Sequence, residues 1–452
     1  MMTLSAAALA VNGRHHGPEV TIAGVTTDSR NIATGDLFVA LKGERFDGHE
    51  YVVDALGRGA AAAMVSREIV ADPPLPQVVV DDTRLALGRL AANWRGRFAM
   101  PLVALTGSNG KTTVKEMIAA IAAEHCGARE PVLATAGNFN NDIGMPLTLL
   151  RLRERHRYAV IEMGMNHEGE IDYLTRIAQP TVALVNNAHR AHVGLLGSVE
   201  AIARAKGEIY AGLKPGGIAL VNADDPFAES WKALNPDRRT VTFGLGDTAD
   251  VRGHVDGTQL QVITPSDAFA VTLQVMGEHN ARNAIAAAAA AFALEIPPHA
   301  IQRGLNGFTG VPGRQQHRAS GHGATVIDDT YNANPDSMKA AARVLALAPG
   351  RKVFVMGDMG ELGNESAALH AEVGAFAKQS GIDRLLALGD ASREAVRAFG
   401  EGASHFASLE LLMDAVRAED QAGTTILVKG SRFMQMERVA ETLAPGGGRH
   451  AA

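Results

Sequence analysis

The strongest chemical signal in the sequence is a short glycine-rich stretch, "TGSNGKTT", at residues 106–113. It follows an apolar run, "PLVAL", and precedes "VKEMIAAIAAE", which has helical spacing. Glycines let backbone N–H groups approach a ligand closely, and a helix N-terminus attracts anions. Lys111 could then reach the β- and γ-phosphates of a nucleotide, and Thr112 could hold Mg²⁺. The pattern predicts a phosphate loop, with an ordinary glycine turn before a helix as the alternative. It departs from the general P-loop pattern at Leu105, where a glycine is usual.

Further polar residues follow runs that read as strands or helices. Glu162 ends "YAVIE", where a carboxylate could bind Mg²⁺ or simply be solvated. His189 and His192 follow "TVALVNN", and a histidine there is either structural or a ligand. Lys206 lies in "ARAKGEIYAG", an amphipathic helix, where a solvent-exposed lysine is the default interpretation.

Three later stretches carry amides and charges. Asn283 in "HNARN" could pair with a nucleobase, whereas Asn280 could do so or cap the helix. Arg314 in "VPGRQ" could contact phosphate. The stretch "IDDTYNANPDSM" is either a turn or a site for a polar ligand.

Strand-like and helical runs alternate from residue 101 onward, which predicts a parallel sheet with helices on both faces. The alternation is interrupted near "NGFTGVPGRQQHRA" and then restarts. We therefore expect an α/β protein with three domains, at residues 1–100, 101–315 and 316–452.

Composition narrows the function classes. The 452 residues carry a net charge of −6 and no basic arm, which argues against nucleic acid as a partner. The single cysteine, Cys126, excludes a disulfide within the chain and fits a reducing compartment. The apolar run at 284–294 is too short to span a bilayer. The N-terminal "MMTLSAAALAVNG" reads as a helix capped by Thr3 or Ser5, and not as a signal peptide. We expect a cytoplasmic monomer without membrane insertion.

Taken together, seven stretches resemble the Mur ligases, the ATP-dependent amide ligases of peptidoglycan synthesis. In chain order they are "TGSNGKTT", "EMGMNHEGEI", "AHVGLLGS", "AKGEIY", "HNARNAIAA", "GVPGRQ" and "DDTYNANPDSM". The stretch "TDSRNIATGDLFVALKGERFDGHEY" resembles the UDP-binding N-terminal domain of the two later ligases of that pathway. The Asp-Asn-Pro-Arg motif for diaminopimelate or lysine is absent, and "MGDMGELG" resembles the member that adds a dipeptide.

This resemblance implies an activity: ATP-dependent joining of D-alanyl-D-alanine to UDP-N-acetylmuramoyl-tripeptide through an acyl phosphate. It implies a central P-loop ATPase-like domain and a Rossmann-like C-terminal domain that binds the dipeptide and closes over ATP. The alternatives are another ligase of the superfamily, such as the diaminopimelate- or lysine-adding Mur ligase or folylpolyglutamate synthase. A nucleotide-switched binding protein without ligase chemistry is a third hypothesis.

The resemblance also implies a role for individual residues. The nucleotide site would comprise Gly107, Ser108, Asn109, Gly110, Lys111, Thr112, Thr113, Asn283, Arg314 and Asp328. The Mg²⁺ ligands would be Thr112, Glu162, His192 and Lys206, with Lys206 carbamylated, and Lys111, Lys206 and His192 would be catalytic. The UDP-sugar would contact Ser29, Arg30, Asp47, Gly48, His49, Asn138, Asn140 and Asn141, and the dipeptide Asn332 and Asn334.

Overall fold

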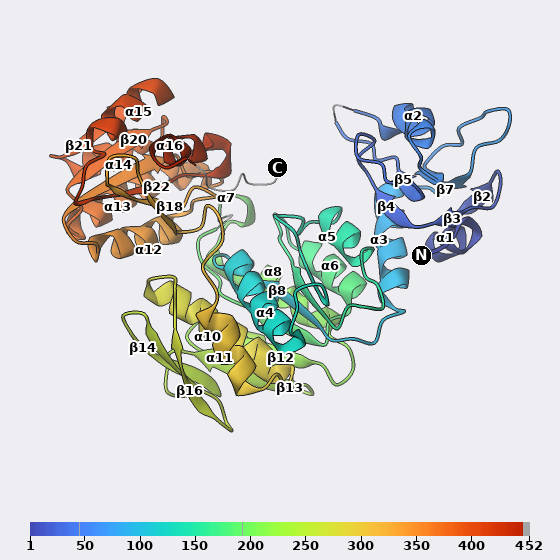
Figure 1. Cartoon of the computed structure of the whole chain (residues 1–452), viewed down its shortest axis with the longest axis horizontal. Coiled ribbons are helices and arrows are strands. Elements are labelled where there is room, and N and C mark those ends of the chain that lie inside the picture. The colour runs from blue at the N-terminus through green and yellow to red at the C-terminus, as the bar shows by residue number, and fades with distance from the viewer. Residues whose placement is uncertain (45, 192, 446–452) are drawn as a thin grey trace.

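Three larger β-sheets follow one another along the chain, with a small two-stranded sheet near its start, in the computed structural model, which describes residues 1–44, 46–191 and 193–445 (Figure 1). The N-terminal sheet has five strands in the order β2-β7-β6-β5-β4. Its strands are β2 (Arg14–His16), β4 (Gly24–Thr26), β5 (Asp36–Val39), β6 (Ala62–Val65) and β7 (Gln77–Val79). A two-stranded sheet, β1 (Met2–Thr3) with β3 (Thr21–Ile22), lies beside α1 (Leu4–Val11). The hydroxyl of Thr3 accepts from the N–H of Ala6, which confirms the predicted cap.

The central sheet has nine strands in the order β16-β15-β14-β13-β12-β11-β8-β10-β9. They are β8 (Leu102–Thr106), β9 (Val132–Ala134), β10 (Tyr158–Glu162), β11 (Val182–Val185), β12 (Ile218–Asn222), β13 (Arg239–Gly244), β14 (Val251–Asp256), β15 (Gln259–Ile263) and β16 (Ala268–Thr272). All neighbours pair in parallel except at β14–β15 and β15–β16. The phosphate loop follows a strand in the parallel part of this sheet.

Helices cover both faces of this sheet because successive strand residues point to opposite sides. Val103 and Leu105 pack with α4 (Lys111–Cys126), whereas Leu102 and Ala104 pack into a second cluster. The remaining central helices are α5 (Gly144–Leu149), α6 (Glu170–Ala178), α7 (Val193–Leu196), α8 (Val199–Gly207), η2 (Glu208–Gly212), α9 (Ala228–Ala233), α10 (Glu278–Ala293) and α11 (Pro298–Asn306).

The C-terminal sheet has six strands in the order β17-β18-β22-β19-β20-β21, antiparallel only at β17–β18. They are β17 (Gln316–Ala319), β18 (Thr325–Asp328), β19 (Arg351–Gly357), β20 (Arg384–Leu388), β21 (Ala403–Phe406) and β22 (Thr424–Lys429). Its helices are α12 (Pro335–Ala346), η3 (Gly363–Glu365), α13 (Ser366–Gln379), α14 (Ser392–Phe399), α15 (Leu409–Ala418), η4 (Arg432–Met434) and α16 (Glu437–Leu443). The expected α/β class is confirmed. Within the described residues, no helix combines the length and apolar character needed to cross a bilayer.

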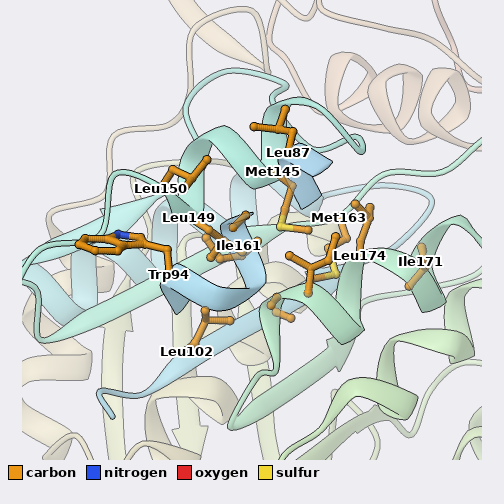
Figure 2. Close-up of a cluster of buried hydrophobic side chains, with 14 of the residues drawn as sticks. Leu87, Trp94, Leu102, Met145, Leu149, Leu150, Ile161, Met163, Ile171 and Leu174 are labelled. Carbon is orange, nitrogen blue, oxygen red and sulfur yellow. The ribbon is translucent and has the colours of Figure 1, made fainter. Parts of the chain in front are cut away.

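The helix α3 (Thr83–Arg95) joins the N-terminal sheet to the central domain. The N-terminal region also contains η1 (Gly48–Tyr51) and α2 (Val52–Gly57). Figure 2 shows Leu87 and Trp94 of α3 among side chains of the central domain, including Met145 and Leu149. Arg95, fully buried, donates to the carbonyls of Ala178 and Gln179 at the end of α6. The first two domains therefore share one hydrophobic core.

Candidate active site

The phosphate loop joins the end of β8 to the start of α4, as the sequence pattern predicts. Gly110 has φ +77°, and a Cβ there would lie 2.3 Å from Oδ1 of Asn283. A Cβ on Gly107 would lie 2.9 Å from Cβ of Asn186. Both positions therefore require glycine, one for its backbone conformation and for space, the other for space alone.

The loop that follows β11 is hydrogen-bonded to the phosphate loop. The N–H groups of Ser108 and Asn109 donate to the backbone and side-chain oxygens of Asn187, at 3.0 and 2.9 Å. The Ser108 hydroxyl accepts from the N–H of His189 at 2.8 Å. His189 is therefore a support of the phosphate loop in this structure.

Lys111 lies over the phosphate loop. Its Nζ donates to the carbonyl of Gly107 at 2.7 Å. Burial lowers the pKa of Lys111, whereas the charge of Glu162 raises it. An ammonium held at the mouth of such a loop is placed to contact phosphate oxygens.

Glu162 and Thr112 form an oxygen-rich pair at the end of β10. The Thr112 hydroxyl donates to Oε2 of Glu162 at 2.8 Å, and Asn140 Nδ2 donates to Oε1 at 2.7 Å. Glu162 is 2% exposed. Carboxylate and hydroxyl oxygens beside a phosphate loop fit Mg²⁺, which prefers oxygen ligands. His192 lies outside the described residues, and among those described no cluster of three or more His, Cys, Asp or Glu side chains could hold a metal.

Lys206 corrects the expectation of an exposed helix lysine, because it is 2% exposed and lines the same cavity as Lys111. Burial, and then the charge of Lys111, lower the pKa of Lys206 well below its usual value. Local amphipathic spacing could not reveal this, since the face that carries Lys206 is covered by another part of the chain.

Asn283 is buried beneath the phosphate loop. Its Oδ1 accepts from Asn186 Nδ2 at 3.1 Å, and its Nδ2 donates to Asn280 at 3.3 Å. The alternative in which Asn280 caps the helix is wrong, because Gly277 is the N-cap of α10. The Asn280 side chain instead donates to the carbonyl of Met276, which precedes the N-cap.

These residues line a cavity of about 1360 Å³ between the central and C-terminal domains. Arg314 enters it from the connecting segment and lies over the ring of Tyr331, 3.9 Å from its centroid. The expected residues among its lining are Ser108, Asn109, Gly110, Lys111, Thr113, Asn138, Asn140, Asn141, Glu162, Lys206, Asn283, Arg314, Asn332 and Asn334. They come from strand ends, loops and helices, and the first and last of them lie more than two hundred residues apart in the sequence.

Asp328 does not join this lining. Its carboxylate accepts from Arg318 Nη1 at 3.2 Å and from the Thr330 hydroxyl at 2.7 Å, and it is 4% exposed. The neighbouring Asp329 lines the cavity and pairs with Lys429 at 2.7 Å. The two aspartates follow one another at the end of a strand, so their side chains leave on opposite sides.

Among the cavity residues that sequence reasoning missed are Asn186 and Lys429. Asn186 directly follows β11, and Lys429 ends β22. The rule applied to Glu162, that ligands bind at the carboxyl ends of parallel strands, could have found both.

The expected UDP-contacting residues of the N-terminal domain lie apart from this cavity. His49 is 5% exposed, contacts Asp47 through Nδ1 at 2.5 Å and accepts from the N–H of Ser66 at 2.9 Å. The N–H and then the side chain of His49 lower the pKa of Asp47 to about 2. A Cβ on Gly48 would lie 2.7 Å from the Leu41 carbonyl oxygen. These contacts fix the conformation of the turn formed by Asp47, Gly48 and His49.

Ser29 and Arg30 lie near the surface of the same domain. Arg30 Nε donates to Asp28 at 2.9 Å and the Arg30 side chain is exposed, whereas Ser29 is half-buried. Their guanidinium and hydroxyl groups remain accessible to a ligand.

Comparison with known proteins identifies the family. Three family models match: the Mur ligase family catalytic domain at 21–95, the Mur ligase middle domain at 105–291 and the Mur ligase glutamate ligase domain at 313–432. The chain is 45% identical, over 99% of both chains, to UDP-N-acetylmuramoyl-tripeptide–D-alanyl-D-alanine ligase of Escherichia coli strain K12. The chain belongs to the Mur ligase family. The resemblance is thereby confirmed, and with it the enzyme class, a ligase.

Solved Mur ligase structures agree in fold. MurF from Acinetobacter baumannii is 39% identical and superposes with a TM-score of 0.90 over 98% of both chains. MurF ligase from Thermotoga maritima, solved in complex with ADP, is 28% identical with a TM-score of 0.81, covering 92% of this chain and 96% of its own.

Proposed function

We propose that this Mur ligase uses ATP to join D-alanyl-D-alanine to UDP-N-acetylmuramoyl-tripeptide, giving the UDP-linked pentapeptide of peptidoglycan synthesis. The observation that carries the proposal is the convergence of Lys111 and Glu162 on one interdomain cavity, with the buried Thr112 hydroxyl donating to Glu162. The E. coli relative that matches nearly end to end bears the name of this activity.

The chemistry explains why a phosphate site is needed. A carboxylate is a poor electrophile, so the γ-phosphoryl group is first transferred to the tripeptide carboxylate, giving an acyl phosphate and ADP. The dipeptide amine then attacks the acyl carbon, the C–N bond forms, and the C–O bond to phosphate breaks. Phosphate leaves, and the amine loses a proton. The protein contributes positioning and charge neutralisation.

In this proposal the phosphate loop, residues Gly107 to Thr113, binds the β- and γ-phosphates through N–H groups and Lys111. Thr112 and Glu162, with His192, would hold Mg²⁺, which when bound supplies positive charge beside the phosphate oxygens. Asn283 would contact adenine, and Arg314 would contact phosphate.

Asp328 remains the predicted ribose partner, although its carboxylate is occupied by Arg318 in this structure. Ribose contact would require that pair to separate. Asp329 and its partner Lys429 already line the cavity.

Lys206 is proposed to carry a carbamate. A buried, uncompensated ammonium next to Lys111 is costly, whereas a carbamate is an anion with oxygen donors suited to Mg²⁺ and to a neighbouring lysine. The group would thereby help neutralise a site crowded with cations.

The other substrates are assigned by domain. Residues 1–100, through Ser29, Arg30 and the Asp47–His49 turn, and the loop bearing Asn138, Asn140 and Asn141 would bind the UDP-sugar. Asn332 and Asn334 of residues 316–452 would bind the dipeptide. Closure of this third domain over residues 101–315 would exclude the water that otherwise hydrolyses an acyl phosphate. One chain supplies every proposed contact, so we propose that the enzyme works as a monomer. Both substrates of the first step are nucleotides, so we propose that it works in the cytoplasm.

A phosphate-release assay tests this function. Purified protein receives ATP and Mg²⁺ with UDP-N-acetylmuramoyl-tripeptide, with D-alanyl-D-alanine, or with both, and a parallel arm receives folate and glutamate. We expect phosphate release and pentapeptide product only when both peptidoglycan substrates are present. Turnover with folate and glutamate would instead assign folylpolyglutamate synthesis, and release unaffected by any acceptor would assign a nucleotide switch.

A further inference from the structure

Four charged side chains connect the central domain to the C-terminal domain beside the phosphate loop. Arg190, in the loop after β11, pairs with Asp336 at 2.7 Å and with Glu372 at 2.9 Å. Lys339 contacts the same Glu372 carboxylate. Asp336 and Lys339 belong to α12 and Glu372 to α13, so Arg190 bridges two helices of the other domain.

The geometry of Arg190 is stronger than that of an isolated surface pair. Its backbone N–H and its Nε also donate to Asp336 Oδ2, at 3.1 and 3.3 Å. Its side chain is 28% exposed, and that of Asp336 is 29% exposed. Burial alone would raise the pKa of Asp336, but the hydrogen bonds from Arg190 lower it below its usual value. Multidentate, partly buried pairs of this kind contribute more than single exposed ones.

The same loop also holds the phosphate loop. Asn187 and His189 bond to the loop at Ser108 and Asn109, and Arg190 is the next residue along. A second bridge lies beside the first, because Asn334, the N-cap of α12, donates to Oδ1 of Asn109 at 2.7 Å. The start of α12 is thus attached once to the phosphate loop, through Asn334, and once to the loop after β11, through Asp336.

We infer that Arg190 is a positioning residue: it holds the C-terminal domain against the phosphate loop while contacting no substrate itself. The inference deepens the proposed ligase function and, for its kinetic part, rests on it. It assigns part of the docked arrangement of the third domain to the ion cluster of Arg190, Asp336, Lys339 and Glu372. The cluster acts beside the hydrogen bond from the Gly194 N–H to the Glu361 carbonyl and beside Val193, which packs against apolar clusters of both domains.

A two-state docking equilibrium gives a specific kinetic signature. If only the docked form binds the dipeptide, undocking raises the dipeptide KM by the inverse of the docked fraction. Turnover at saturating dipeptide stays the same, because the substrate restores docking. The KM for the UDP-linked tripeptide also stays the same, since its proposed contacts lie mainly in the two domains that share a core.

The experiment compares Arg190→Met with the unaltered chain. We expect a rise in the dipeptide KM of about tenfold, within the usual range of couplings between sites, with kcat and the tripeptide KM unchanged. High salt should raise the dipeptide KM of the unaltered chain toward that of the variant, because screening weakens the cluster. Arg176→Met is the matched control, as it breaks a 2.8 Å ion pair within α6 only. A fall in kcat alone, or equal changes in both KM values, would overturn the inference.

A second measurement is independent of ligation. Spin labels at Glu229→Cys in α9 and Asp414→Cys in α15, with Cys126→Ser, report the distance between central and C-terminal domains. We expect Arg190→Met to broaden this distribution. Arg190→Lys keeps the positive charge but loses the guanidinium that bonds to both carboxylates, so it should broaden the distribution less. An unchanged distribution in a folded Arg190→Met chain would refute docking by Arg190, whereas failed ligation with a broadened distribution would refute only the proposed activity.

Discussion

At the scale of single residues, two lysines of the cavity influence each other electrostatically. Lys111 is held by carbonyls of the phosphate loop, whereas Lys206 is 2% exposed and feels the charge of Lys111. Two ammonium groups side by side, away from water, repel each other and lose hydration. A phosphate ligand would compensate Lys111, and a carbamate would remove the second positive charge altogether.

Lys206→Ala should lower ligase turnover by about 10²-fold or more, the usual effect of removing one charged group from a phosphoryl- or acyl-transfer site. Short-chain carboxylic acids such as acetate should restore part of this loss by placing a carboxylate in the vacated space. Phosphate release measures both effects, and ¹³C NMR with labelled bicarbonate should show a carbamate signal in the unaltered chain only. Lys111→Ala is the control, since acids cannot replace its positive charge. Full activity of Lys206→Ala without added acid would remove Lys206 from the site.

At the scale of elements, two hydrogen bonds in series hold the end of the strand that carries Glu162. Lys115, one turn beyond Lys111 on α4, is 1% exposed and donates to the Thr135 carbonyl at 2.6 Å. The Thr135 hydroxyl accepts from the N–H of Glu162 at 3.0 Å. The helix that begins at the phosphate loop thereby holds both the end of β10 and the start of the loop that bears Asn140.

Replacing Lys115 by methionine should keep the aliphatic packing but leave the buried Thr135 carbonyl without its donor. We expect the free energy of unfolding to fall by about 1–3 kcal/mol, the cost of one unsatisfied buried polar group. Urea unfolding followed by circular dichroism measures this, with Lys232→Met, at a half-buried lysine of α9 that pairs with Glu229, as the control. Equal stability of the two variants would show that the carbonyl is satisfied in another way.

At the scale of the whole molecule, the three domains are joined by two different kinds of contact. The helix α3 buries Trp94 and Leu87 in the central domain (Figure 2), so the first two sheets share a core. The C-terminal sheet has its own two clusters. It meets the central domain through polar contacts such as those of Arg190 and Asn334 and through Val193, a half-buried side chain packed against clusters of both domains. Apolar burial is lost only on unfolding, whereas polar contacts can exchange with water, so the third domain is the one free to move.

Trp94→Ala should therefore destabilise the first two domains together, by about 3–5 kcal/mol for a large buried aromatic side chain. Hydrogen exchange read by mass spectrometry should show lower protection in α3, α5 and α6, with the C-terminal sheet unaffected. Phe354→Ala, in the C-terminal core, is the reciprocal control and should lower protection only there. Loss of protection in all three sheets after either substitution would contradict this division.

The sequence alone determined the features that depend on neighbouring residues. The apolar run 102–105, the glycines at 107 and 110 and the helix that follows specify a strand, a tight turn and a helix N-terminus locally, so the phosphate loop could be predicted from spacing. The position of Glu162 at a strand end followed from the same local pattern. Motif order was specific enough to predict the family, which the comparisons confirm.

Only the tertiary structure decided which side chains are buried and which meet. Lys206 became a cavity residue because distant segments cover its helix face, and Asp328 turned away to Arg318 while Asp329 faced the cavity. The pairing of Arg190 with Asp336 joins positions 146 residues apart. Burial and long-range charge pairing are properties of the packed chain, and a pattern of neighbouring residues carries no information about which distant segment will cover it.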